Sequence, residues 1–224
     1  MDLALPPACV ACGAPGAELC DPCRRNLLWR RGPACVRCGE PVLVAGRLCG
    51  GRHDELRLIT RLVAPLGYAG TGGALVRRFK LDADPAAAGW LLRTMAAAWR
   101  EAAADGWRRA GLVPVPLHSR RRRERGFDQA AWLVAGLGVR LRLEPLTGVL
   151  VRVRHTAPQG DPRVLSRDRN VADAFGLRRA SKVRDRRIVL VDDVFTSGAT
   201  TRACAALLRA AGAREVAVLV ACRS

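Results

Sequence analysis

The segment Val189-Leu-Val-Asp-Asp-Val-Phe-Thr-Ser-Gly-Ala-Thr-Thr201 predicts a buried strand, a short turn and a helix in close succession. The apolar run Ile188–Val191 is typical of a central parallel strand that is covered on both faces. Asp192 and Asp193 are expected at the point where this strand leaves the sheet. After the turn, residues 201–211 have the composition of a helix. The order strand, acids, turn, helix therefore predicts an α/β fold with a site at the end of the strand.

This order of residues suits a sugar that carries a phosphate. A helix N-terminus presents unpaired N–H groups and the positive end of the helix dipole, so it can hold an anion. The turn contains a glycine, which lets a ligand approach the backbone, and hydroxyls that add donors. Its residues are Thr196, Ser197, Gly198, Ala199 and Thr200. The neighbouring carboxylates suit ribose hydroxyls or a hydrated Mg²⁺. The alternative is an ordinary turn with capping residues, which does not need two acids at the strand end.

The same segment resembles the phosphoribosyl pyrophosphate (PRPP) motif of type I phosphoribosyltransferases. The shared pattern is four apolar residues, two acids, Val194, one variable position and then Thr-Ser-Gly-Ala-Thr. The resemblance implies an open parallel sheet with helices on both faces. In such sheets a ligand binds beyond the carboxyl ends of the strands.

Length and charge set outer limits. The chain has 224 residues, a formal net charge of +18 and 50% hydrophobic residues, which suits one medium domain with a small appendage. The apolar runs are too short to cross a membrane and the N-terminus lacks a secretory pattern, so we expect a cytoplasmic protein without a membrane span. The charge favours polyanionic partners. Nearly all basic residues are arginine, however, which a bias toward GC-rich codons also produces. We identify no internal repeat.

Most cysteines lie near the N-terminus, in pairs that are two residues apart. Such knuckles turn both sulfurs toward one centre, as in tetrahedral zinc sites. The first set is Cys9, Cys12, Cys20 and Cys23. The second candidate set is Cys35, Cys38, Cys49 and His53, where His53 replaces a fourth cysteine; the alternative is an incomplete second site. The sequence leaves open which knuckles pair. We expect a zinc-ribbon-like module over residues 1–55, a second domain over residues 56–224, and Cys204 and Cys222 in the core.

Further blocks resemble the ComF family, in the family's order and after a zinc module of the family's type. They are Tyr68-x-Gly70, Leu75 with Phe79-Lys80, Pro114-Val-Pro-Leu117, Arg120 to Arg125 with Gly126-Phe-Asp-Gln129, Arg154-x-Thr156-x2-Gln159, and Arg169-Asn170-Val171-x2-Ala174-Phe175. The family has a phosphoribosyltransferase fold and is associated with competence for DNA uptake. One departure is Asp128, where the family pattern has asparagine. This change adds a carboxylate beside a basic loop.

The resemblance implies a glycosyltransferase that displaces pyrophosphate from C1 of PRPP. Asp192 and Asp193 would hold the ribose, directly or through Mg²⁺, and Lys80 would stabilise the leaving pyrophosphate; these three are the expected catalytic residues. The expected PRPP-binding residues are Lys80, Arg125, Asp192, Asp193, Val194, Thr196, Ser197, Gly198, Ala199 and Thr200. Arg77 and Arg78 either neutralise the same pyrophosphate or face water. No activating base stands out, so the acceptor and the oligomeric state stay unassigned.

A second function remains open. The run Arg120–Arg125 either contacts PRPP, contacts a nucleic-acid backbone, or is a solvated loop. The competing hypothesis is a non-catalytic accessory protein of competence that binds nucleic acid, single-stranded DNA in particular, with the same fold. Arg154, Thr156 and Gln159 fall in a segment that we expect to be a lid over the reacting centre.

Overall fold

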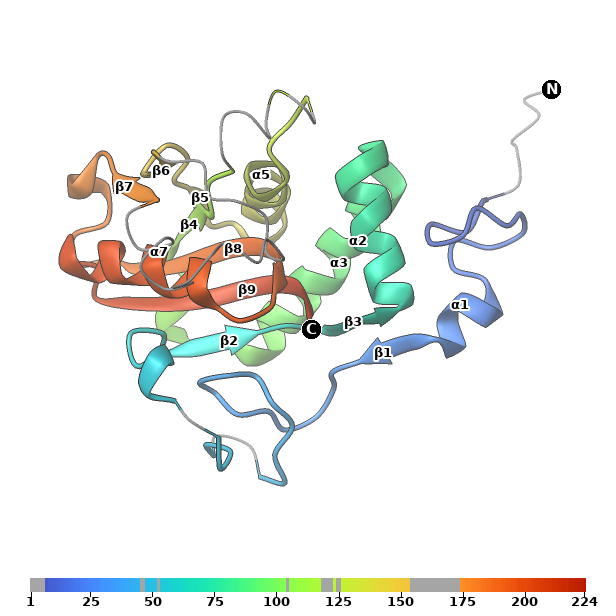
Figure 1. Cartoon of the computed structure of the whole chain (residues 1–224), viewed down its shortest axis with the longest axis horizontal. Helices are drawn as coiled ribbons and strands as arrows, with labels where there is room; N and C mark the ends of the chain where they lie inside the picture. Colours follow the sequence, from blue (N-terminus) through green and yellow to red (C-terminus); the bar gives the residue numbers. More distant parts are fainter. Residues whose placement is uncertain are drawn as a thin grey trace, which may run out of the picture.

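The computed structural model describes residues 7–44, 47–51, 53–103, 105–117, 123, 126–153 and 174–224 (Figure 1). Its centre is a seven-stranded sheet with the order β1-β3-β9-β8-β4-β5, and β2 also pairs with β9. The strands are β1 Leu27–Trp29, β2 Arg61–Val63, β3 Leu66–Gly70, β4 Gly111–Pro114, β5 Glu144–Pro145, β8 Arg187–Phe195 and β9 Glu215–Arg223. Every pairing is parallel except that of β1 with β3. A separate antiparallel pair joins β6 (Leu150–Arg152) to β7 (Phe175–Leu177).

Helices cover both faces of this sheet. These are α2 Thr71–Asp82, α3 Pro85–Ala102 and α5 Gln129–Leu141 on one face and α7 Ala199–Ala210 on the other. The short helix α1 Asp21–Arg25 lies in the N-terminal segment, and three 3₁₀ helices are described, η1 Asp54–Leu56, η2 Asp105–Trp107 and η3 Ala180–Lys182. Successive side chains of a strand point to opposite faces. Val189 and Val191 of β8 accordingly pack with apolar residues of α2, α3 and α5, whereas Ile188 and Leu190 pack with those of α7. The expected α/β fold with a largely parallel sheet is confirmed.

The expected helices lie close to where the sequence predicted them, because local signals fix their ends. Asp84 caps α3: its carboxylate accepts hydrogen bonds from the N–H groups of Ala86 and Ala87 at 2.8 and 3.2 Å, and Pro85 follows it. The tryptophans of α3, Trp90 and Trp99, are buried in the core. None of the described helices is long and apolar enough to cross a membrane.

The end of β8 differs from the prediction. Pairing with β4 ends at Val191, but pairing with β9 continues through Asp192, which lies opposite Val220, to Phe195. Asp192 and Asp193 therefore lie in the part of β8 that still pairs with β9. They lie past the point where β8 stops pairing with β4. The helix also starts earlier than predicted, at Ala199.

The N-terminal segment contains an internal repeat, so the expectation of none was wrong. Residues 8–15 (ACVACGAP) recur as residues 34–41 (ACVRCGEP). Both form a knuckle closed by an isolated bridge, Ala8 with Pro15 and Ala34 with Pro41. In Figure 1 the first knuckle lies on the side of α2 and the second lies below β2. Two metal-binding units built to one plan are therefore attached to different parts of the α/β body.

Candidate functional site

A lysine and two aspartates meet at the carboxyl end of β8. Lys80, near the end of α2, places its Nζ 2.8 Å from Oδ2 of Asp193. The side chain of Asp193 is 8% exposed and that of Lys80 is 25% exposed, so the pair is largely shielded from water. The two residues are far apart in the sequence. The structure thus brings together the three residues that were expected to be catalytic.

The first of the two acids is poorly solvated. Burial raises the pKa of Asp192 to about 8; the neighbouring carboxylate of Asp193 adds to the rise, and the charge of Lys80 opposes it. Oδ1 of Asp192 accepts the backbone N–H of Asp193 at 2.9 Å. Asp128, which caps α5 by accepting the N–H of Ala131 at 3.0 Å, also raises the pKa of Asp192. The residue that departs from the family pattern therefore acts on this site electrostatically.

The predicted phosphate loop is open to solvent. Thr196 and Ser197 are exposed, and Ala199 and Thr200 are half-buried in the first turn of α7. The N–H groups of that turn have no partner within the helix ladder and can receive an anion. Gly198 has φ +76°, and a Cβ there would lie 2.6 Å from Cζ of Phe195, so the position requires glycine. The loop therefore meets the conditions for holding a phosphate at its surface.

The helix that carries Lys80 packs very close to β3. A Cβ at Gly72 would lie 2.1 Å from the carbonyl oxygen of Gly67. Of the two arginines on this helix, Arg77 is exposed, whereas Arg78 donates to the carbonyl oxygen of Cys9 at 3.1 Å and pairs with Asp84 at 2.6 Å. Neither alternative expected for Arg78 holds, because it connects α2 to the first knuckle.

Several predicted site residues lie outside the described residues. They are Arg125 and most of the run Arg120–Arg125, and Arg154, Thr156 and Gln159 of the expected lid. The two core cysteines are unsuited to nucleophilic chemistry. Burial raises the pKa of Cys204 above its ordinary range, and burial, followed by the charge of Asp193, raises the pKa of Cys222 to about 12.

The first cysteine set is brought together around one point. The four sulfurs of Cys9, Cys12, Cys20 and Cys23 lie within 4.8 Å of one another. Sulfurs around tetrahedral zinc are about 3.8 Å apart, given Zn–S bonds of about 2.3 Å, and Sγ of Cys12 and Cys20 are 3.7 Å apart. The N–H of Cys20 also points at Sγ of Cys9, at 3.5 Å. The arrangement fits one zinc ion.

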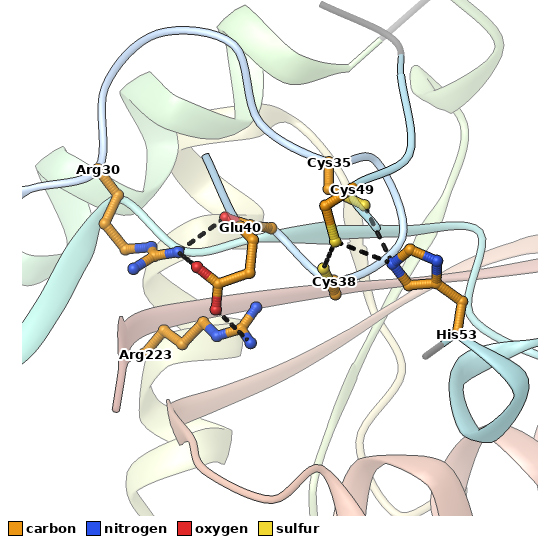
Figure 2. Close-up of polar contacts among 8 residues, drawn as sticks. Arg30, Cys35, Cys38, Glu40, Cys49, His53 and Arg223 are labelled. Atoms are coloured by element: carbon orange, nitrogen blue, oxygen red, sulfur yellow. Dashed lines mark hydrogen bonds and ion pairs between the residues drawn. The ribbon is translucent and has the colours of Figure 1, made fainter. Parts of the chain in front are cut away.

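The second set has the same form with a histidine as its fourth member (Figure 2). Nε2 of His53 lies 3.3 Å from Sγ of both Cys35 and Cys49, and Sγ of Cys38 lies 3.4 Å from that of Cys49. Three thiols and one imidazole nitrogen around a common centre are a usual zinc ligand set. Knuckles therefore pair in sequence order and are not interleaved, which the sequence had left open.

A cavity of about 860 Å³ lies elsewhere, between the second knuckle, β2 and α3. Its lining includes Trp29, Arg61 and Arg93, but none of the residues expected to bind the sugar phosphate. The candidate site is the cluster of Lys80, Asp192 and Asp193 and not this cavity. Only that cluster combines paired charges with a strand that leads into a helix N-terminus.

Known proteins resemble both parts of the chain. Residues 1–51 match the double zinc ribbon domain and residues 133–224 match the phosphoribosyl transferase domain. The chain is 30% identical over 213 residues to competence protein F of Haemophilus influenzae, across 89% of this chain and 88% of that protein. It is 38% identical over 113 residues to DNA utilization protein YhgH of Escherichia coli K12, across 50% of this chain and 49% of that protein.

Among solved structures, one described as the allosteric regulatory enzyme of purine biosynthesis aligns with a TM-score of 0.43 and 21% identity, covering 65% of this chain and 30% of that one. At this score the likeness carries no argument. The two domain matches confirm the expected phosphoribosyltransferase-like fold and the N-terminal zinc ribbon.

Proposed function

Because this chain belongs to the family of competence protein F, we propose that its α/β domain binds PRPP, or a related ribose 5-phosphate, together with Mg²⁺, and transfers the phosphoribosyl group with release of pyrophosphate. The observation that carries the proposal is the mostly buried Lys80–Asp193 pair, 2.8 Å long, on the strand that leads directly into the N-terminus of α7. This arrangement offers a cation, two acids and an anion site within one small region.

Each residue has a role that follows from its charge and position. Asp192 and Asp193 hold the ribose hydroxyls, and the N–H groups and hydroxyls of residues 196–200 hold the 5′-phosphate. Lys80 faces the developing charge of the leaving pyrophosphate, and Arg125 assists it. Carboxylate oxygens are the ligands that Mg²⁺ prefers, and a cation here would displace the proton that Asp192 otherwise holds. When bound, Mg²⁺ neutralises pyrophosphate charge. The chain's own contribution is positioning and charge stabilisation.

For the N-terminal module we propose two structural zinc ions. Their ligands are Cys9, Cys12, Cys20 and Cys23 at the first site, and Cys35, Cys38, Cys49 and His53 at the second. Both sets supply four protein ligands, which leaves no open position for substrate and favours a structural role over a catalytic one.

The second candidate function is nucleic-acid binding by the same fold, without turnover. Two observations favour it: the net charge of +18 and the relative named for DNA utilization. Affinity for single-stranded DNA that falls steeply with salt, and falls again when Arg120–Arg125 are neutralised, would support it. Affinity that is insensitive to both would rule it out. We expect either activity to take place in the cytoplasm.

Calorimetry tests the first function directly. PRPP and ribose 5-phosphate are titrated into the protein with and without Mg²⁺, and into the double variant Asp192→Asn/Asp193→Asn. The variant Asp185→Asn is the matched control, because Asp185 is exposed and has a positive φ (57°) that asparagine also adopts. We expect Mg²⁺-dependent binding that the double variant loses and the control keeps. Absence of binding by the unaltered protein would refute the proposal. A screen for pyrophosphate release over nucleobases and amines then identifies the acceptor.

A further inference from the structure

A glutamate in the second knuckle links the second zinc set to the C-terminal strand. Glu40 follows Cys38-Gly39, and its carbonyl oxygen accepts the N–H of Cys35 at 2.7 Å, so the knuckle fixes its backbone. Figure 2 shows its carboxylate between two arginines. Oε1 lies 2.7 Å from Nη2 of Arg223, and Oε2 lies 3.0 Å from Nη2 of Arg30. Arg223, at the end of β9, is thereby held by a residue of the metal-binding knuckle.

The same arginine contacts the residue that supports the phosphate loop. Arg223 lies opposite Phe195 in the β8–β9 register, and its Cζ is 5.6 Å from the centre of the Phe195 ring. The next residue, Ser224, donates its N–H to the carbonyl oxygen of Phe195 at 3.1 Å. The ring of Phe195 lies directly against Gly198 of the loop. A continuous line of contacts thus runs from Glu40 to Gly198.

A second line of contacts starts at the other end of the same metal set. His53 immediately precedes η1, and Glu55 lies in η1. Oε2 of Glu55 is 2.8 Å from Nη1 of Arg202 on α7, and the same Nη1 donates to the carbonyl oxygen of Ser197 at 2.8 Å. Arg202 therefore connects the segment after His53 to the middle of the phosphate loop. The two lines reach different sides of the loop.

The first metal set has no such link to the loop among the described contacts. Its connections to the body include two to α2, where the carbonyl oxygen of Cys9 accepts from Arg78 and that of Cys23 accepts from Oγ1 of Thr71 at 2.8 Å, and an ion pair of Glu18 with Arg93 on α3. Because α2 carries Lys80, each knuckle pair contacts a different half of the candidate site.

We propose that the second zinc ribbon holds the phosphate loop in its binding conformation, with Glu40, Glu55, Arg202 and Arg223 as positioning residues. Preordering a loop removes part of the entropy cost of binding. The inference rests on the proposed function in one respect, namely that residues 196–200 receive the 5′-phosphate. The mechanical coupling of the ribbon to the loop can be measured without any ligand.

The experiment compares Glu40→Gln, Glu55→Gln and the double variant with the unaltered chain. Three quantities are measured: zinc content, amide hydrogen exchange of residues 198–202, and affinity for ribose 5-phosphate. The matched control is Glu144→Gln. Glu144 is on β5, away from the loop, and its ion pair with Arg186 (2.8 Å) is similar in length and exposure to those of Glu40 and Glu55. We expect two zinc ions to be retained. Exchange at 198–202 should rise about threefold to tenfold in each single variant and further in the double variant, with a matching loss of affinity.

Arg223→Gln and Arg202→Gln remove the same two ion pairs from the arginine side, at residues that are distant in sequence from the metal ligands. Arg223→Lys keeps the charge, so it should restore part of the protection of the loop amides against hydrogen exchange. Loop exchange and ribose 5-phosphate affinity equal to those of Glu144→Gln in all of these variants would overturn the inference. If the unaltered chain binds no ribose 5-phosphate, the proposed function fails, while the exchange data still decide whether the ribbon holds the loop.

Discussion

The raised pKa of Asp192 predicts that ligand binding depends strongly on pH above neutrality. Desolvation of its half-buried carboxyl group, together with the neighbouring Asp193, raises the pKa of Asp192 from the ordinary value of 3.8 to about 8. At pH 7 this group is therefore mostly protonated. Because Mg²⁺ and ribose hydroxyls require the carboxylate, affinity for Mg²⁺ with ribose 5-phosphate should rise about tenfold from pH 7 to pH 9. Close to one proton should be released per ligand bound at pH 7.

Calorimetry in buffers of different ionisation enthalpy measures both quantities. The range from pH 7 to pH 9 is chosen because the phosphate of the ligand, with a second pKa of about 6, is already a dianion there. Asp185→Asn is the control that keeps the pH dependence, whereas Asp192→Asn should bind weakly and with little dependence on pH. Affinity of the unaltered protein that stays constant from pH 7 to pH 9, without proton release, would refute the role given to Asp192.

Four further predictions follow from the same geometry. Asp192→Asn should gain stability relative to the unaltered protein as pH rises from about 4 to about 8, because in that window Asp192 keeps its proton in the folded chain but has lost it in the unfolded chain, so the unaltered protein becomes less stable; urea unfolding at several pH values measures this. Gly198→Ala should cost about 2–3 kcal/mol in urea unfolding, from the positive φ and the contact with Phe195, whereas Gly148→Ala, with a similar φ (+72°) and open space, should cost only about 1–2 kcal/mol; equal costs would remove the role of the ring. Lys80→Met should remove the ion pair of Asp193 and cost about 1–3 kcal/mol, and it should weaken pyrophosphate binding in calorimetry, with Lys80→Arg intermediate. Zinc chelation should lower Tm by about 10 °C or more in differential scanning fluorimetry, and added Zn²⁺ should reverse it; a Tm unaffected by chelation would contradict the zinc assignment.

The parts of the fold that could be predicted are those with a local cause. The strand before Asp192 and the cysteine knuckles each depend on residues that are close in sequence, and both are found near their predicted positions. The association of Lys80 with the acids of β8 came from the family resemblance, and the structure places Lys80 in contact with Asp193. Hydrophobic periodicity alone gives no such long-range pairing.

The parts that could not be predicted depend on contacts between distant segments. Glu40 and Arg223 are 183 positions apart in numbering (223 − 40), and nothing in either local sequence marks the other as its partner. Arg78 is a similar case. A basic residue near Lys80 suggests a contact with a bound anion, but Arg78 donates a hydrogen bond to the carbonyl oxygen of Cys9. The two knuckles share their cysteines but differ in charge at two positions, Ala11 against Arg37 and Ala14 against Glu40.

The short strand β1 has a consequence for how this protein can be handled. Leu27–Trp29 pairs antiparallel with β3, so the N-terminal segment supplies an edge strand of the central sheet. Removing the N-terminal segment in order to crystallise or express the α/β domain separately would remove that edge strand and leave β3 with unpaired backbone groups, a known cause of self-association. A fusion partner or affinity tag is therefore better attached at the C-terminus. The attachment should preserve the hydrogen bond from the N–H of Ser224 to the carbonyl oxygen of Phe195. Truncations that begin after Trp29 should therefore yield aggregated material.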